Sequence, residues 1–324
     1  MNLYLLFLIF LLLLGAILVY FKLADKFGII DRPNDRSLHT VHTIRGGGII
    51  FMVAVILHAL FFKSFDNWFL TGFLLVSLVS FIDDTRDLPN RIRLAAQFTA
   101  IVLLLIGLGM EAFSPLYLLL VLIVAAGALN AYNFMDGING ITGGYSLIAL
   151  ITLFYINNTL HILADDSFFY VIILALLIFN FFNFRKKAIC FAGDVGSISM
   201  AYIIIALILK AIFQTGNLMY VMLLAVYGVD SVLTIVHRIW LRENIFRAHR
   251  IHLFQVIVSN GGVSHLKMSS IYMLTQLMVN AVIISIFDFE AITQVLISGS
   301  ILFALALAYF LVKRHYYLKV ARNN

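Results

Sequence analysis

Long apolar runs separated by short polar segments extend over the whole chain. An α-helix of roughly 20 predominantly apolar residues spans the hydrocarbon core of a bilayer, and these runs have about that length. They are therefore predicted to be helices rather than the strands of a membrane barrel. The pattern predicts an all-α, polytopic membrane protein with eleven spans, at 3–20, 49–63, 67–82, 94–109, 115–133, 142–157, 168–183, 197–213, 218–236, 269–287 and 292–312.

Composition excludes a soluble globular protein. Of the 324 residues, 63% are hydrophobic and 12% are charged, whereas a soluble domain is about half apolar and about one quarter charged. No polar stretch is long enough for a separate soluble domain, so residues 1–324 are interpreted as a single transmembrane domain. The chain has one cysteine, Cys190, which excludes an intramolecular disulfide and fits a reducing compartment.

The distribution of positive charge predicts the orientation of the spans. No lysine or arginine precedes the first run, and Lys22 and Lys26 follow it, which indicates an uncleaved span with its N-terminus outside. With that orientation 20 of the 22 Lys and Arg residues fall on the inner side, and Lys63 and Lys210 are the exceptions. All unusual polar motifs then share one side, in the predicted inner loops at 22–48, 83–93, 134–141, 184–196 and 237–268.

The most unusual segment lies at 130–144, between two apolar runs. Asn130, Asn133, Asp136 and Asn139 recur every three residues there, among several glycines. Polar groups are costly at a membrane edge, so they indicate function by default, and this spacing would put them on one helix face. Amides can bind a nucleobase or a sugar, and a carboxylate can bind a metal ion or a hydroxyl. Amide-mediated packing between helices is the alternative.

Two aspartate motifs flank other spans. Asp83 and Asp84 end the third span, and adjacent carboxylates repel unless a cation or a shared proton offsets the repulsion. Mg²⁺ takes such ligands together with substrate phosphates, while a solvated acidic loop is the alternative. Gly193-Asp194-Val195-Gly196-Ser197 opens the eighth span, where a carboxylate can bind metal and the helix amides favour phosphate. A simple N-cap by Asp194 or Ser197 would also explain this motif.

The longest inner loop is basic. Guanidinium groups match phosphate geometry, so phosphate binding is favoured there over an ordinary positive loop, and a zinc site is disfavoured. The residues concerned are Arg247, His249, Arg250 and His252. Asp230, inside the ninth span, needs a partner, and a structural ion pair explains it as well as catalysis does.

Together these motifs resemble the polyprenyl-phosphate N-acetylhexosamine-1-phosphate transferase family, also called glycosyltransferase family 4. They occur in the family's order over about residues 30 to 260. Asn139 stands where the family often has a second aspartate, and Phe254 and Gln255 stand where many members have histidines. This ending, with the upstream segments 36–40 and 45–48, resembles the branch that initiates O-antigen or capsule chains.

The resemblance implies an Mg²⁺-dependent transferase, in which Mn²⁺ could substitute. It would move a HexNAc-1-phosphate from a UDP-N-acetyl amino sugar to undecaprenyl phosphate and release UMP. The enzyme would lie in the bacterial cytoplasmic membrane, with a periplasmic N-terminus, a cytoplasmic C-terminus and a cytoplasmic active site. A homodimer would fit the family, and no nucleic-acid partner is expected.

The resemblance also implies roles for individual residues. The expected metal ligands are Asp194 and Asp84. The expected catalytic residues are Asp83, Asp84, Asp136, His249 and His252. The expected substrate-binding residues are Asn130, Asn133, Asn139, Arg247, Arg250, His39 and Arg45.

Two other classes of protein remain as alternatives. A membrane prenyltransferase could use Asp83, Asp84 and Asp87 with Mg²⁺, but it would need a second aspartate-rich motif, and Asp136-Gly-Ile-Asn139 is a poor one. A non-enzymatic transporter or flippase would be expected to carry polar residues near the middle of the membrane and to show internal repeats. No convincing repeat is present, and the polar residues gather on one side.

Overall fold

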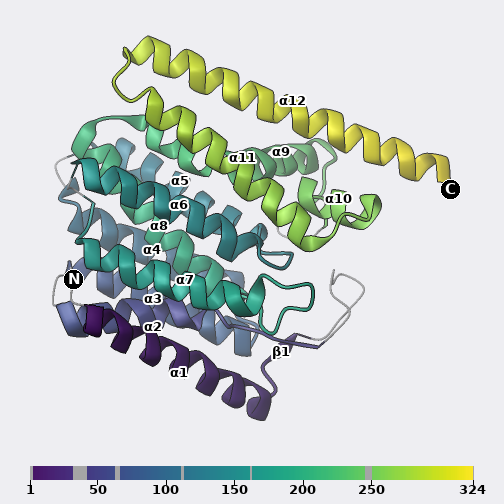
Figure 1. Ribbon diagram of the computed structural model, residues 1–324. Helices are drawn as coiled ribbons and strands as arrows, with labels where there is room; N and C mark the ends of the chain where they lie inside the picture. Colours follow the sequence, from purple (N-terminus) through teal and green to yellow (C-terminus); the bar gives the residue numbers. More distant parts are fainter. Residues whose placement is uncertain are drawn as a thin grey trace.

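The computed structural model describes residues 3–31, 42–62, 66–110, 113–160, 163–244 and 250–323, and nearly all of the regular structure in them is helical (Figure 1). This confirms the predicted all-α class. The helices are α1 (Leu3–Phe27), α2 (Ile49–Phe62), α3 (Asn67–Thr85), α4 (Asn90–Gly107), α5 (Pro115–Phe134), α6 (Ile141–Leu160), α7 (Asp166–Asn183), α8 (Gly193–Thr215), the 3₁₀ helix η2 (Leu218–Leu224), α9 (Ala225–Trp240), α10 (Leu253–Gly261), α11 (His265–Ser285) and α12 (Ala291–Asn323).

Each of the eleven predicted spans lies on one of these helices or, for the ninth, on η2 and α9 together. Within the described ranges, nine helical segments are long and apolar enough to cross a membrane. The other two predicted spans are α2, which has 14 residues, and α6, which has 20 residues and several polar ones. Several boundaries differ from prediction: α1 continues seven residues past 20, and α12 continues beyond 312.

The ninth span changes helix type part-way along its length. It begins as η2 and continues as α9. Such a change frees backbone groups that must find partners inside a membrane. The side chain of Gln276 from α11 supplies them, because its Nε2 donates to Met222 O (2.9 Å) and its Oε1 accepts from Val226 N (3.0 Å). The change from η2 to α9 thus explains why α11 carries a buried glutamine at this position.

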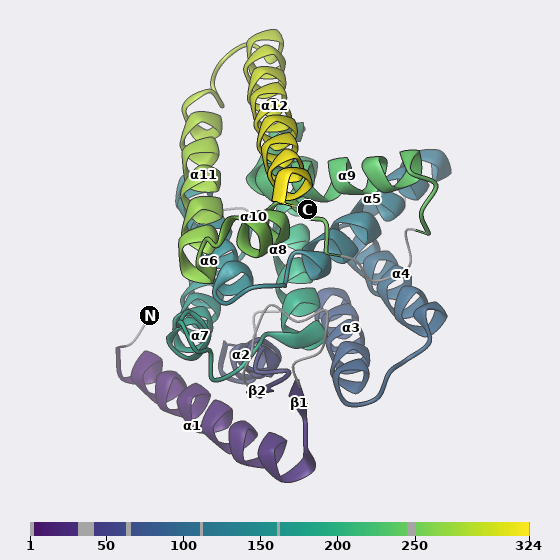
Figure 2. The ribbon, with the colours of Figure 1, turned by 90° about the vertical axis from the view of Figure 1, so that its right-hand side faces the viewer.

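Helix α8 occupies the centre of the bundle. Its apolar window is 89% buried by protein, against 22% for α1 and 11% for α12, which lie at the periphery (Figure 2). Helix α9 projects sideways from the bundle in the same view, and its Val232, Ile239 and Trp240 are exposed. Apolar side chains with this exposure fit contact with lipid tails.

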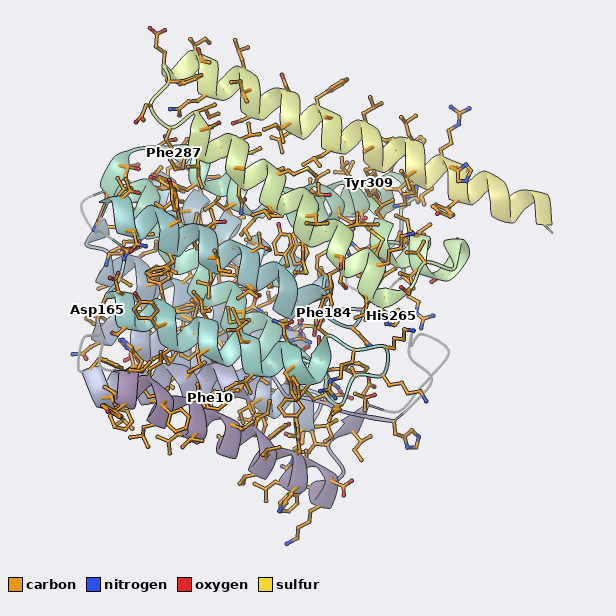
Figure 3. The ribbon with its side chains drawn as sticks, in the orientation of Figure 1. Phe10, Asp165, Phe184, His265, Phe287 and Tyr309 are labelled. Carbon is orange, nitrogen blue, oxygen red and sulfur yellow. The ribbon has the colours of Figure 1, made fainter. Side chains whose placement is uncertain are left out.

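One end of the bundle carries the predicted inner loops, and we call it the site end. In Figure 3 the labelled Phe184 and His265 lie at this end, whereas Asp165 and Phe287 lie at the opposite end. A two-stranded sheet, β1 (Ile30–Asp31) and β2 (Thr43–Ile44), also lies here, a small addition to the predicted all-α fold. Ile44 N donates to Ile189 O (3.3 Å), and Phe191 N donates to Ile44 O (2.8 Å), so β2 joins the segment before α8. The sheet thereby places Arg45 next to the start of α8.

Candidate active site

The carboxylate of Asp84 binds the N-terminus of α8. Its Oδ1 accepts from Asp194 N (2.9 Å) and from Arg45 Nε (2.7 Å), and its Oδ2 accepts from Val195 N (2.9 Å). Ala192, the residue before the helix, has no side-chain cap. The first backbone N–H groups of a helix need such a partner. Asp84, from the end of α3, therefore caps α8, and the alternative in which Asp194 or Ser197 caps it is wrong.

Glycines allow this close approach of chain segments. A Cβ on Gly48 would lie 2.1 Å from the Cα of Gly196, and a Cβ on Gly193 would lie 2.5 Å from Asp84 Oδ2. Gly193 also has a φ of +70°, which only glycine adopts readily. The glycine motifs at 46–48 and 193–196 thus let the turn after β2 pack directly on the first turn of α8.

Arg93, from the first turn of α4, joins two of the aspartates. Its Nη1 lies 3.0 Å from Asp83 Oδ2, and its Nη2 lies 3.3 Å from Asp194 Oδ2. Arg45 Nη2 approaches the other oxygen of Asp194 at 3.9 Å. Sequence reasoning missed Arg93. The short connection between α3 and α4 was a signal, because it brings the first turn of α4 back beside Asp83. We call the three carboxylates that these arginines hold together the acid cluster: Asp83, Asp84 and Asp194.

Two arginines lie beside the three carboxylates of this cluster. Burial would lower the pKa of Arg45, but the carboxylates of Asp84 and Asp194 outweigh this effect and raise the pKa above its usual value. The guanidinium therefore stays protonated.

Asp87 is exposed and lies outside the acid cluster. The three aspartates of the Asp83-Asp84-x-x-Asp87 motif, which a prenyltransferase would use together, therefore do not meet at one point.

The asparagine-rich segment does not form one helical face. Helix α5 ends at Phe134, so Asn133 lies on the helix, whereas Asp136 lies in the turn that follows it. Asn133 Oδ1 accepts from Ser197 Oγ (2.6 Å) in the first turn of α8. Asp136 Oδ1 accepts from Thr142 Oγ1 (2.6 Å). Burial raises the pKa of Asp136 to about 6, although the hydrogen bond from Thr142 acts in the opposite direction.

The outer two asparagines of the repeat make structural contacts. Asn130 Nδ2 donates to Gln97 Oε1 (2.7 Å) across the α4–α5 interface, as the helix-packing alternative predicts. Asn139 Nδ2 donates to Arg185 O (2.8 Å), and Asn139 O accepts from Ser269 Oγ (2.8 Å). The loop 135–140 is thereby fastened to α11 and to the segment that follows α7. These contacts use the amide hydrogens that a substrate would need, so the geometry favours Asn133 over Asn130 and Asn139 as a substrate contact.

Asp230 has the structural partner that its position requires. Its Oδ2 accepts from Tyr272 OH (2.6 Å), its Oδ1 accepts from Leu253 N (2.9 Å), and His252 Nδ1 lies 3.4 Å from the same oxygen. His252 is 1% exposed and directly precedes α10, where its backbone N donates to Gln255 Oε1 (3.3 Å). This burial favours a positioning role for His252 over the predicted catalytic one.

The end of the basic loop meets the asparagine-rich segment. A Cβ on Gly137 would lie 3.0 Å from the ring of Phe254 and 3.2 Å from Gln255 Nε2. Phe254 and Gln255 therefore lie directly against the loop 135–140, and Arg250 is half-buried shortly before them. Three predicted site residues lie outside the described residues: His39, Arg247 and His249.

The acid cluster fits a divalent cation bound together with a substrate. Within the described ranges, no three His, Cys, Asp or Glu side chains come together as a complete metal site. Mg²⁺, however, commonly takes one or two carboxylates and completes its shell with substrate phosphates and water. Asp83 and Asp194 share the Arg93 guanidinium, so positive charge is already favoured between them. Both oxygens of Asp84 accept backbone hydrogen bonds, whereas only Oδ1 of Asp83 does, from Leu88 N (2.7 Å). The geometry therefore favours Asp83 over the predicted Asp84 as the partner of Asp194.

Comparison with known proteins gives one family match and several relatives. Residues 67–212 match the family described as Glycosyl transferase family 4. A probable undecaprenyl-phosphate N-acetylglucosaminyl 1-phosphate transferase of Bacillus subtilis is 25% identical over 273 residues, 78% of this chain and 76% of that protein. A phospho-N-acetylmuramoyl-pentapeptide-transferase of Dictyoglomus thermophilum is 29% identical over 64% of this chain and 72% of that protein. An undecaprenyl-phosphate alpha-N-acetylglucosaminyl 1-phosphate transferase of Yersinia pestis is 25% identical over 79% of this chain and 76% of that protein.

Proposed function

We propose that this chain, a multi-pass membrane protein that belongs to glycosyl transferase family 4, transfers a HexNAc-1-phosphate from a UDP-N-acetyl amino sugar to undecaprenyl phosphate and releases UMP. The relatives act on polyprenyl phosphates by their names, which supports a polyprenyl-phosphate sugar-phosphate transferase. The observation that carries the proposal is the acid cluster at the N-terminus of α8, held by Arg45 and Arg93 beside the loop 135–140.

The reaction must bring two anions together. An oxygen of the lipid phosphate forms a new bond to the β-phosphorus of the UDP-sugar, and the bond from that phosphorus to the bridging oxygen breaks, so that UMP leaves. Positioning and charge neutralisation do most of the work in such a transfer. A bound divalent cation, Mg²⁺ or Mn²⁺, would supply Lewis-acid neutralisation of the diphosphate, and Asp194 with Asp83 would hold it.

The arginines of the cluster have a second use once substrates bind. Arg45 and Arg93 contact carboxylates through geometry that also suits phosphate oxygens. Exchange of these partners for phosphates would free Asp83 and Asp194 for the cation. Asp84 would stay bound to α8 and keep its first turn in place, which makes it a positioning residue in this proposal.

The donor would lie against the loop 135–140. Asn133 and Asp136 offer an amide and a carboxylate there, and Phe254 and Gln255 close the loop from the other side. The inner membrane location, with the site end toward the cytoplasm, is supported by the positive charge of the inner loops. An initiating role in O-antigen or capsule synthesis is supported by the Phe254–Gln255 ending.

The test is an assay of purified protein with undecaprenyl phosphate, Mg²⁺ and a panel of UDP-N-acetyl sugars, in which UMP release is followed with and without EDTA. We expect UMP that depends on the lipid phosphate and the metal, from one preferred donor. Release of pyrophosphate from a prenyl diphosphate, with no UMP from any donor, would instead identify a prenyltransferase. Absence of both products from a folded protein would favour a transporter.

A further inference from the structure

A lateral groove lies between α6, α7 and α11, away from the acid cluster. It encloses about 420 Å³, within the usual size range of small-molecule sites. Most of its lining is apolar and includes Leu147, Phe181 and Met273. Phe181 is 63% exposed, so the groove opens sideways, toward the surface that faces lipid tails.

Glycines in the first turn of α6 let two side chains of the groove wall pack directly on this helix. A Cβ on Gly144 would lie 2.4 Å from Met273 Sδ, and a Cβ on Gly143 would lie 2.5 Å from Asn180 Oδ1. Glycine inside a helix is less favourable than alanine. Glycine is explained here because a larger residue would displace Met273 and Asn180 from the groove wall.

The site end of the groove is positively charged. Arg185 lines it there, and Lys186 and Lys187 follow, both exposed. Arg185 Nε donates to Phe181 O (2.5 Å), and its guanidinium lies 4.4 Å from the centre of the Phe181 ring. Its terminal amino groups have no hydrogen-bond partner in the part of the chain that the structure describes. No acidic residue is among the described residues that line the groove.

Asn180 adds an unsatisfied acceptor. It lines the groove one turn before Phe184, and its Oδ1 is a buried atom without a hydrogen-bond partner among the described residues. A buried acceptor of this kind is destabilising unless a partner is found. The oxygen packs against Gly143, so a ligand hydroxyl in the groove would reach it after a turn of the Asn180 side chain.

We propose that this groove binds an anionic glycerophospholipid from the leaflet at the site end. The phosphate would pair with Arg185, and an acyl chain would cover Leu147, Phe181 and Met273. A glycerol hydroxyl would donate to Asn180 Oδ1 once that side chain turns toward the groove. The occupant is not the lipid that reacts. A reacting phosphate must reach the acid cluster, and none of its three aspartates lines the groove.

The groove is coupled to the candidate site through one loop. A Cβ on Gly140 would lie 2.2 Å from the Phe184 ring, and Asn139 Nδ2 donates to Arg185 O (2.8 Å). Phe184 and Arg185 therefore support the back of the loop 135–140 while they line the groove. A bound lipid would hold this loop in place, and this consequence, unlike the binding itself, rests on the proposed function.

The experiment is native mass spectrometry of the full chain titrated with phosphatidylglycerol or phosphatidylcholine, with no sugar nucleotide present. We expect preferential retention of phosphatidylglycerol. Arg185→Gln should reduce its affinity about fivefold, the usual effect of one basic residue on an anionic headgroup. Lys26→Gln, an exposed basic residue at the same end on α1, is the matched control and should change nothing.

A second variant separates lost charge from lost folding. Leu147→Trp fills the groove without changing its charge and should lower retention of both lipids, while thermal unfolding shows that the protein is intact. Equal retention of the two lipids, or an unchanged affinity in Arg185→Gln, would overturn the proposal. Displacement of the bound phospholipid by equimolar undecaprenyl phosphate would overturn it as well and assign the groove to the reactant. Because the experiment measures lipid binding, its result tests this proposal whether or not the protein releases UMP.

Discussion

The two ends of the bundle use polar side chains differently. At the opposite end, three helices begin with a cap from the residue directly before them: Asp66 before α3, Ser114 before α5 and Asp165 before α7. Each side chain accepts a hydrogen bond from a backbone N–H two or three residues later. Such caps are local, and they only stabilise their own helix.

At the site end, α8 takes its cap from Asp84, which lies 110 positions before the N–H of Asp194 that it accepts. The same carboxylate also pairs with Arg45, and its neighbour Asp83 pairs with Arg93. A local cap would have satisfied the helix equally well. A cap recruited from a distant helix, together with two arginines, is a costlier arrangement that assembles one site. The comparison shows that a helix cap supplied over a long sequence distance marks the acid cluster, because α11, at the same end but outside the cluster, keeps a local cap from Ser264.

The largest contrast between the two ends is expected from matched aspartate substitutions. Asp194→Asn should lower the rate of UMP release by about two to three orders of magnitude, the usual effect of losing one strong electrostatic contact to the reacting group. Asp165→Asn should leave the rate unchanged and cost at most about 1 kcal/mol of stability. Rates and thermal unfolding of both variants test this, and a near-normal rate in Asp194→Asn would remove that residue from the metal site.

Asp84→Asn should affect folding as well as activity. The variant keeps an oxygen for the cap but loses the ion pair with Arg45, so the free energy of unfolding should fall by on the order of 2 kcal/mol. The measurement is thermal unfolding together with the Mg²⁺ dependence of the residual rate. If Asp84 only positions α8, the substitution should leave the Mg²⁺ concentration for half-maximal rate nearly unchanged. A large increase in that concentration would show instead that Asp84 holds the metal.

Glycine substitutions test the close contact at the site end. Gly48→Ala should destabilise the protein by about 1–3 kcal/mol and reduce activity, because the new Cβ would overlap backbone atoms of α8. Gly15→Ala in α1, where nothing lies within 4 Å, is the control and should be neutral or slightly stabilising. Equal melting temperatures for the two variants would contradict the contact.

The smallest effect concerns pH. Because the pKa of Asp136 is raised to about 6 in the folded protein, the folded state binds more protons than the unfolded state between that value and about 3.8. Stability of the substrate-free protein should therefore rise as pH falls from 7 to 5, relative to Asp136→Asn. Melting temperatures of both proteins at the two pH values measure this difference, and parallel profiles would show that the carboxylate is not desolvated.

The sequence by itself determined the membrane class, the approximate spans and the polar motifs. Span length and composition are local properties, so the pattern of apolar runs was sufficient for them. The motifs at 83–84, 133–136 and 193–197 were identified for the same reason. A carboxylate or an amide beside an apolar run is energetically unfavourable, and the sequence alone indicates this without knowledge of any contact. The prediction that Asp83, Asp84, Asp194 and Arg45 share one region agrees with their contacts.

Only the tertiary structure decided which of these groups touch. Three features depend on which helices are neighbours: Asp84 caps α8, Arg93 bridges two aspartates, and Asn130 packs against Gln97 while Asn133 contacts α8. In a membrane protein the lipid-facing and protein-facing sides of a helix are both apolar, so the periodicity that identifies neighbours in soluble proteins is weak. The order in which the helices pack, with α3 and α5 against α8, therefore became visible only in three dimensions.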